Sequence, residues 1–113
     1  MDIRYYRQGR DEPVREYLDD MIRTYPEVAA KIRARIEILG AEGPRSKALE
    51  CRHMGDGLWE LKVRSHIGFH RIFFCITVGV IWLLHAFTKK SAKTPVNELE
   101  TARKRMKVVM SNG

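Results

Sequence analysis

Basic side chains placed among apolar residues are the groups in this sequence whose types and spacing suit chemistry on an anion. Lys62 and Arg64 alternate with apolar residues, and Arg71 lies among aromatic ones. The planar guanidinium of an arginine can contact two oxygens of one phosphate or carboxylate. An arginine in an apolar strand is costly unless its head group is paired or reaches solvent. Two interpretations of Arg71 therefore stay open: an ion pair with a carboxylate such as Glu60, or an anion-binding site.

Four histidines are candidates for proton transfer, because imidazole titrates near neutral pH. His85 lies near the end of an otherwise apolar segment, where a single histidine is more often packed and hydrogen-bonded than catalytic. We keep it as a possible acid or base. Nothing in the sequence favours one of the other three histidines, His53, His66 and His70, over the others as a proton-transfer group.

Segment 87–95 is the densest basic stretch, with Lys89, Lys90 and Lys93 ahead of Thr94 and Pro95. Threonine suits a helix N-cap and proline the first helical position, so a helix is predicted to begin here. A basic segment that leads into a helix N-terminus is a common place for contacts to phosphate. The alternative is a solubilising loop.

The net charge of +7 is carried entirely by residues 58–113, which contain ten lysines and arginines and three acids. This asymmetry favours a polyanionic partner. Four of the basic residues are predicted near the end of the last helix, where the helix dipole favours cations. They are Arg103, Lys104, Arg105 and Lys107. Acids are scarce in this half, which disfavours metal-dependent nuclease chemistry, and we expect neither a metal nor a cofactor.

Cysteine content and apolar runs bear on where the protein works. The two cysteines, Cys51 and Cys75, make neither a disulfide framework nor a zinc site. Residues 1–12 contain no apolar signal region, and the near-apolar run at 78–87 is too short to span a bilayer. We therefore expect a cytoplasmic protein with no membrane partner.

The hydrophobic pattern predicts an α+β fold in a single domain, residues 1–113. Helical spacing predicts two helices joined as a hairpin, and alternation predicts three strands in an antiparallel meander. The expected order is a short strand at 3–6, helices from Pro13 and from 24–26, a loop at 41–57, strands from Leu58 onward and a helix after Thr94.

Alternation along the predicted strands also sorts the candidate residues by face. The groups predicted to share a face are Lys62, Arg64 and His66; Arg71 with Phe69, Phe73 and Cys75; and His85 and Lys89 with Ile81, Leu83 and Phe87. Trp59, Leu61 and Val63 lie opposite the first group and are expected in the core.

Four short motifs, in this order, resemble the HigB-like, phage-derived branch of the RelE/ParE toxin superfamily. They are Leu58-Trp59-Glu60-Leu61, His70-Arg71-Ile72-Phe73-Phe74, Leu84-His85-Ala86-Phe87-Thr88-Lys89-Lys90, and Thr94-Pro95 before a helix with Glu98. The resemblance implies a RelE-like fold and a type II toxin, a ribosome-dependent mRNA endonuclease that inhibits translation. Its chemistry would be attack of a ribose 2′-OH on the adjacent phosphate without a metal. The implied partners are the ribosome, mRNA and a cognate antitoxin, often one with a helix-turn-helix domain.

The resemblance also implies roles for the basic residues. Arg71 is the first candidate for a clamp on the scissile phosphate, and Arg64 is the second. Lys89, as a charge stabiliser, and His85, as an acid or base, complete the implied catalytic set. The implied contacts to the RNA backbone are Lys62, Lys90, Lys93, Arg103 and Lys104.

The sequence departs from part of the superfamily in its tyrosines. Some RelE-type toxins carry a catalytic tyrosine near their end, whereas this sequence has none after Tyr25. A tyrosine mechanism would need Tyr5, Tyr6 or Tyr17 to fold into the site. Two other functions stay open: a ParE-like inhibitor of DNA gyrase, which shares the fold, and a plain nucleic-acid-binding protein, which would need no convergent basic cluster.

Overall fold

Strands and helices follow one another in the order that the sequence predicted, with one additional strand. The computed structural model describes residues 1–90 and 93–112. Its elements are β1 (Asp2–Tyr5), α1 (Pro13–Thr24), α2 (Pro26–Glu42), β2 (Glu50–Gly55), β3 (Leu58–Ser65), β4 (Gly68–Thr77), β5 (Val80–Lys89) and α3 (Val96–Asn112). Proline is the first residue of both α1 and α2. The N–H group at this position makes no hydrogen bond within a helix, so proline, which has no N–H, costs no bond there. The α+β class, the helical hairpin, the antiparallel strands and the last helix are confirmed.

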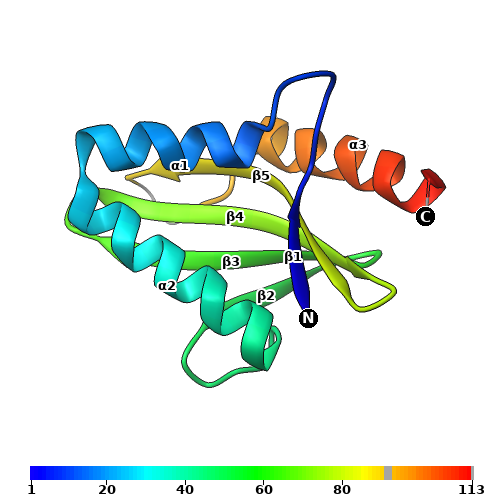
Figure 1. Ribbon diagram of the computed structural model, residues 1–113, viewed down its shortest axis with the longest axis horizontal. Coiled ribbons are helices and arrows are strands. Elements are labelled where there is room, and N and C mark those ends of the chain that lie inside the picture. Colours follow the sequence, from blue (N-terminus) through cyan, green and yellow to red (C-terminus); the bar gives the residue numbers. More distant parts are fainter. Residues whose placement is uncertain (91–92, 113) are drawn as a thin grey trace.

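The strands form one sheet in the order β1-β5-β4-β3-β2 (Figure 1). Neighbouring strands run antiparallel, except that β1 pairs with β5 in parallel. The β4–β5 hairpin turns at Val78 and Gly79, with φ values of 50° and 74°. Two successive positive φ values belong to the tight turn whose twist matches the flanking strands. β3, β4 and β5 therefore form the predicted meander, with β1 and β2 at its edges.

An apolar core lies on each face of the sheet. α1 and α2 cover one face, where Leu18 and Ile32 pack with Phe74. α3 packs on the other face, where Met106 contacts the cluster around Phe73. The neighbouring residues Phe73 and Phe74 thus enter different cores, because successive side chains of a strand point to opposite faces.

Segment 41–57 is not the loop that the sequence predicted, because it contains β2. This strand pairs with β3 from Glu50 opposite Lys62 to Gly55 opposite Leu58. Its sequence, Glu-Cys-Arg-His-Met-Gly, has no β-branched and no Phe, Tyr or Trp residue, so strand propensity gave no signal. The strand brings Glu50 beside the basic residues of β3.

A bulge in the β4–β5 pairing changes which residues of β5 share a face. The pairing skips Leu84. His85 and Lys89 therefore lie on the α3 face, whereas Ile81 and Leu83 lie in the core under α1 and α2. The prediction that these four side chains share a face was wrong, because simple alternation does not allow for an extra residue.

Candidate functional site

The α3 face of the sheet carries a group of basic side chains at the end where α3 begins. Lys62 and Arg64 of β3, Arg71 of β4 and Lys89 of β5 share this face with Phe69. Phe69 pairs with Arg64 on one side and with Lys89 on the other. Strand pairing thus brings together charges that are far apart in the sequence.

Three cations surround the ring of Phe69. The ring centroid is 5.8 Å from the Lys62 Nζ, 5.5 Å from the Arg64 Cζ and 6.0 Å from the Arg71 Cζ. A cation within about 6 Å of an aromatic face is attracted by the ring quadrupole. Phe69 is partly exposed, so positive charge gathers at a surface that a ligand can reach. We call Lys62, Arg64, Phe69, Arg71 and Lys89 the Phe69 cluster.

Arg71 forms the floor of the cluster, in a buried ion pair with Glu60. Their side chains are 1% and 2% exposed, and Arg71 Nη1 donates to Glu60 Oε1 at 2.7 Å. The hydroxyl of Thr94 donates to Glu60 Oε2 at 2.9 Å. The prediction that Thr94 caps the last helix and that Pro95 begins it was wrong by one residue, since α3 begins at Val96. The interpretation of Arg71 as the partner of Glu60 is confirmed. Its role as a phosphate clamp stays a prediction, and burial places it beneath the groups that a phosphate would meet first.

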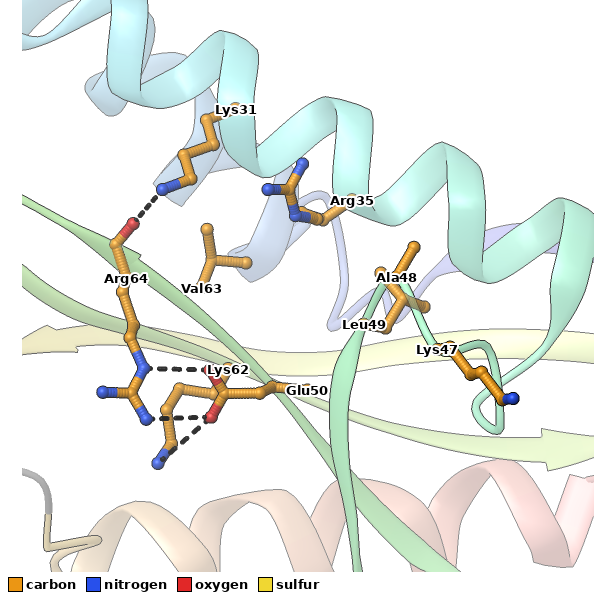
Figure 2. Close-up of a pocket in the computed structure, with 9 residues that line it drawn as sticks. All are labelled: Lys31, Arg35, Lys47, Ala48, Leu49, Glu50, Lys62, Val63 and Arg64. Atoms are coloured by element: carbon orange, nitrogen blue, oxygen red, sulfur yellow. Dashed lines mark hydrogen bonds and ion pairs between the residues drawn. The ribbon is translucent and has the colours of Figure 1, made fainter.

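Arg64 lies at the surface, held by Glu50 of β2. Its Nε and Nη2 donate to the two carboxylate oxygens at 2.9 and 3.1 Å, and the Lys62 Nζ lies 3.7 Å from Glu50 Oε2 (Figure 2). The hydrogen bond from Arg64 is the main reason that the pKa of Glu50 lies below its usual value. Glu50 is therefore ionised at neutral pH, and its carboxylate takes the two-oxygen position that a phosphate would take against Arg64.

His85 is fixed between β5 and α3. Its Nε2 lies 3.0 Å from Glu98 Oε1 and its Nδ1 lies 3.1 Å from Arg105 Nη1. Arg105 also donates to the carbonyl oxygen of Leu84 at 3.0 Å. His85 lies four positions before Lys89 of the Phe69 cluster, or about 13 Å along the strand. Both ring nitrogens thus have structural partners, and proton transfer by His85 stays a prediction.

The other basic residues of α3 lie in the middle of the helix. Because α3 continues to Asn112 with no basic residue in its last turn, the predicted explanation from the helix dipole is wrong. Arg103 donates instead to the carbonyl oxygens of Gly55 and Met54, at 3.2 and 2.6 Å. These bonds hold α3 on the end of β2. Lys104 is exposed and stays a predicted contact to RNA.

The basic segment after β5 is described in part. Lys90 and Lys93 are exposed, and Ser91 and Ala92 between them lie outside the described residues. The start of the segment is held close to Gly68, where a Cβ would lie 2.6 Å from the carbonyl oxygen of Lys89. Gly68 also has a φ of +140°, so only glycine suits this approach.

A cavity of about 690 Å³ opens beside the Phe69 ring. Tyr25, His66 and Lys90 line it together with Phe69. The rings of Tyr25 and His66 meet edge to face, with centroids 6.2 Å apart. His66 lies in the β3–β4 turn, past the strand that was predicted to carry it. Aromatic rings beside a cation suit a nucleobase, which stacks on side-chain rings.

A buried hydrogen-bond network on the opposite face was not predicted. His70 is 0% exposed; its Nδ1 lies 3.1 Å from the Tyr17 hydroxyl and 2.9 Å from Thr88 Oγ1, and its Nε2 lies 2.6 Å from Ser65 Oγ. Burial raises the pKa of Tyr17 to about 12. Burial, and secondarily the charge of Lys31, lowers the pKa of His70. Tyr17 therefore serves a neutral network under α1 and does not enter the Phe69 cluster.

The network predicts that the protein loses stability in mild acid. His70 has a folded pKa below its ordinary value of 6.5, so unfolding allows it to bind a proton. Its contribution is complete above pH 6.5 and is lost as the pH falls below this value toward the folded pKa. Urea unfolding between about pH 7.5 and 5.5 should show this decline, and His70→Gln should flatten it. The exposed His66→Gln is the control, and an equally steep decline in His70→Gln would contradict the assignment.

In residues 1–90 and 93–112, no helix combines the length and the apolar character needed to cross a membrane, and no three His, Cys, Asp or Glu side chains gather closely enough to hold a metal ion. Burial raises the pKa of the Cys51 and Cys75 thiols to about 11. Both thiols are therefore protonated and unreactive at neutral pH.

Comparison with known proteins gives a family for most of this chain. Residues 19–107 match the model of the phage-derived Gp49-like proteins (DUF891), and no curated protein matches the chain. The matched range runs from α1 into α3 and contains every residue of the Phe69 cluster. The chain belongs to the Gp49-like family of phage-derived proteins, a toxin-like family related to the RelE/HigB fold.

Proposed function

We propose that this chain is the toxin of a toxin–antitoxin pair and that it cuts mRNA on the ribosome. The observation that carries the proposal is the convergence of Lys62, Arg64 and Arg71 on the partly exposed ring of Phe69, with Lys89 on the adjoining strand. Cations bind the phosphates of an RNA strand and aromatic rings stack on its bases, so this combination suits single-stranded RNA. Membership of a toxin-like family supports the same function.

In the proposed reaction, the ribose 2′-OH gives up its proton and its oxygen attacks the adjacent phosphorus. The bond from phosphorus to the 5′ oxygen of the next nucleotide breaks, and that oxygen takes up a proton. The products are a 2′,3′-cyclic phosphate and a 5′-OH. Negative charge grows on the phosphoryl oxygens in the transition state, and cations already in place stabilise it. The proposed stabilisers are Arg64 and Lys89, whose exposed side chains lie on either side of Phe69. The buried Arg71 lies beneath them.

The rest of the RNA strand has proposed contacts on both sides of the cut. The cavity beside Phe69 receives one base, stacked against Tyr25 or His66. The exposed side chains of Lys90, Lys93 and Lys104 contact the backbone farther along. Stacking tolerates any base, so this arrangement holds the strand without reading much of its sequence.

The proposed partners follow from the same function. A toxin-like family implies an antitoxin, and we propose a small helix-turn-helix protein whose gene lies beside this one. The ribosome and its message would be the target, which places the toxin in the cytoplasm. The gene neighbourhood is the simplest observation that bears on this partner.

Expression of the chain is expected to stop growth and to leave mRNAs cut within their reading frames. Primer extension on RNA taken after induction measures this, because each cut leaves a new 5′ end. The control is a message whose start codon has been removed, which should stay intact if cleavage needs a translating ribosome. Growth arrest with intact transcripts and an induced SOS response would overturn the proposal in favour of the gyrase inhibitor.

A further inference from the structure

A small basic pocket lies between α2 and the edge of the sheet, next to the Phe69 cluster. It has a volume of about 250 Å³, and Figure 2 shows its lining. The charged side chains of the lining are Lys31, Arg35, Lys47, Glu50, Lys62 and Arg64. Five of the six are basic, so the one carboxylate leaves most of the positive charge unbalanced.

The pocket exists because β2 is shorter than β3. β2 begins at Glu50, opposite Lys62, so the end of β3 from Val63 extends beyond it. The Lys31 Nζ reaches this end of β3 from α2 and donates to the carbonyl oxygen of Arg64 at 2.5 Å. A helix thus brings basic side chains to the strand edge that a longer β2 would have covered.

The charges of the pocket differ in their partners. Arg64 and Lys62 both contact the carboxylate of Glu50 (Figure 2). In the part of the chain that the structure describes, neither Arg35 nor Lys47 forms an ion pair. Uncompensated charge at a concave surface attracts an external anion, since low-dielectric walls concentrate its field.

We propose that this pocket binds the phosphate backbone of RNA and that Glu50 occupies the place of a phosphate while RNA is absent. The two-oxygen contact between Glu50 and Arg64 is the contact that an arginine makes with phosphate. Lys62 and Arg64 belong to both the pocket and the Phe69 cluster, so an RNA strand can pass from one to the other around the end of β3. The inference rests on the proposed function in taking RNA as the polyanion.

Opposite changes of charge in the pocket should have opposite effects on RNA binding. The measurement is fluorescence anisotropy of a labelled single-stranded RNA of about 12 nucleotides, titrated with the purified chain at several salt concentrations. Lys31→Gln with Arg35→Gln should weaken binding and reduce the slope of log affinity against log salt by about 1.4, or about 0.7 for each lost phosphate contact. Glu50→Gln should strengthen binding and steepen the same slope.

The matched control is Arg33→Gln with Lys107→Gln, which removes two charges from exposed positions outside the pocket. This variant should keep the slope of the unchanged protein. Equal slopes in the two double variants, or weaker RNA binding by Glu50→Gln, would overturn the inference. An acidic protein segment as the true occupant would give the first of these results.

Message and ribosomal RNA share this backbone chemistry, and binding to purified ribosomes separates them. If the pocket holds ribosomal RNA, the Lys31→Gln/Arg35→Gln variant loses affinity for vacant ribosomes. If it holds the message, the loss is confined to ribosomes loaded with mRNA, and no loss in either case contradicts the inference. If the proposed function is wrong and the inference is right, the unchanged chain will cut no mRNA, but its RNA binding will still depend on the pocket residues.

Discussion

Replacing Arg71 with alanine is expected to lower the free energy of unfolding by about 3–5 kcal/mol, the usual cost of removing one partner from a buried ion pair. Glu60, which is 2% exposed, would keep its hydrogen bond from the Thr94 hydroxyl. It would lose the buried guanidinium of Arg71, which balances its charge. A loss of this size is a large part of the total stability of a small protein. Urea unfolding followed through the fluorescence of Trp59 and Trp82 measures it.

A double variant separates the structural role of Arg71 from any role in cleavage. Arg71→Met with Glu60→Met removes both charges, and apolar replacement of a whole buried pair is often neutral or stabilising. We expect this variant to fold with a stability near that of the unchanged protein and to lose RNA cleavage, because the Phe69 cluster has lost a cation. Full cleavage by the double variant would remove Arg71 from the site, and a stable Arg71→Ala protein would contradict the burial argument.

Replacing Arg64 with alanine is expected to reduce RNA cleavage about 10²- to 10³-fold, the range seen when one preorganised donor to a developing anion is removed. Arg64 is 61% exposed and its partner Glu50 is 49% exposed. Exposed ion pairs contribute little to stability, so the unfolding midpoint should hardly change. The measurement is the rate of mRNA cleavage on purified translating ribosomes.

The control for Arg64 is an exposed arginine with the same kind of partner elsewhere. Arg23 of α1 pairs with Asp20, and both side chains are 70% exposed. Arg23→Ala removes one charge and one surface ion pair, as Arg64→Ala does, and should leave cleavage unchanged. Equal losses in the two variants would show that net charge, and not the position of Arg64, determines activity.

The prediction of the site from the sequence was best in strands where apolar and charged residues alternate, because there the alternation shows which side chains are buried. In β3, apolar residues such as Leu61 and Val63 alternate with charged ones, so Lys62 and Arg64 were placed on the correct face. The face of Arg71, shared with Phe69 and Phe73, was also predicted correctly. Alternation is a local property, and it holds wherever pairing is regular.

The features that the sequence did not reveal depend on contacts between distant segments. Glu60 lies two residues before Lys62 on the same face of β3, but contacts with the segment before α3, including Thr94, leave Glu60 buried while Lys62 stays partly exposed. The contact of His70 with Tyr17 joins residues 53 positions apart, and no pattern within either segment indicates it. β2 forms by pairing at a sheet edge, and its residues alone show no preference for a strand.

The pairing of β1 with β5 has a consequence for how this protein is made. Residues 2–5 are synthesised well before their partners, residues 80–83. Pairing between such distant segments is slow, because a long loop must close before any contact forms. β5 also carries Lys89 to the side of Phe69, so a nascent chain has no complete Phe69 cluster until residue 89 has emerged. If the protein acts on ribosomes as proposed, this delay would protect the ribosome that is making it.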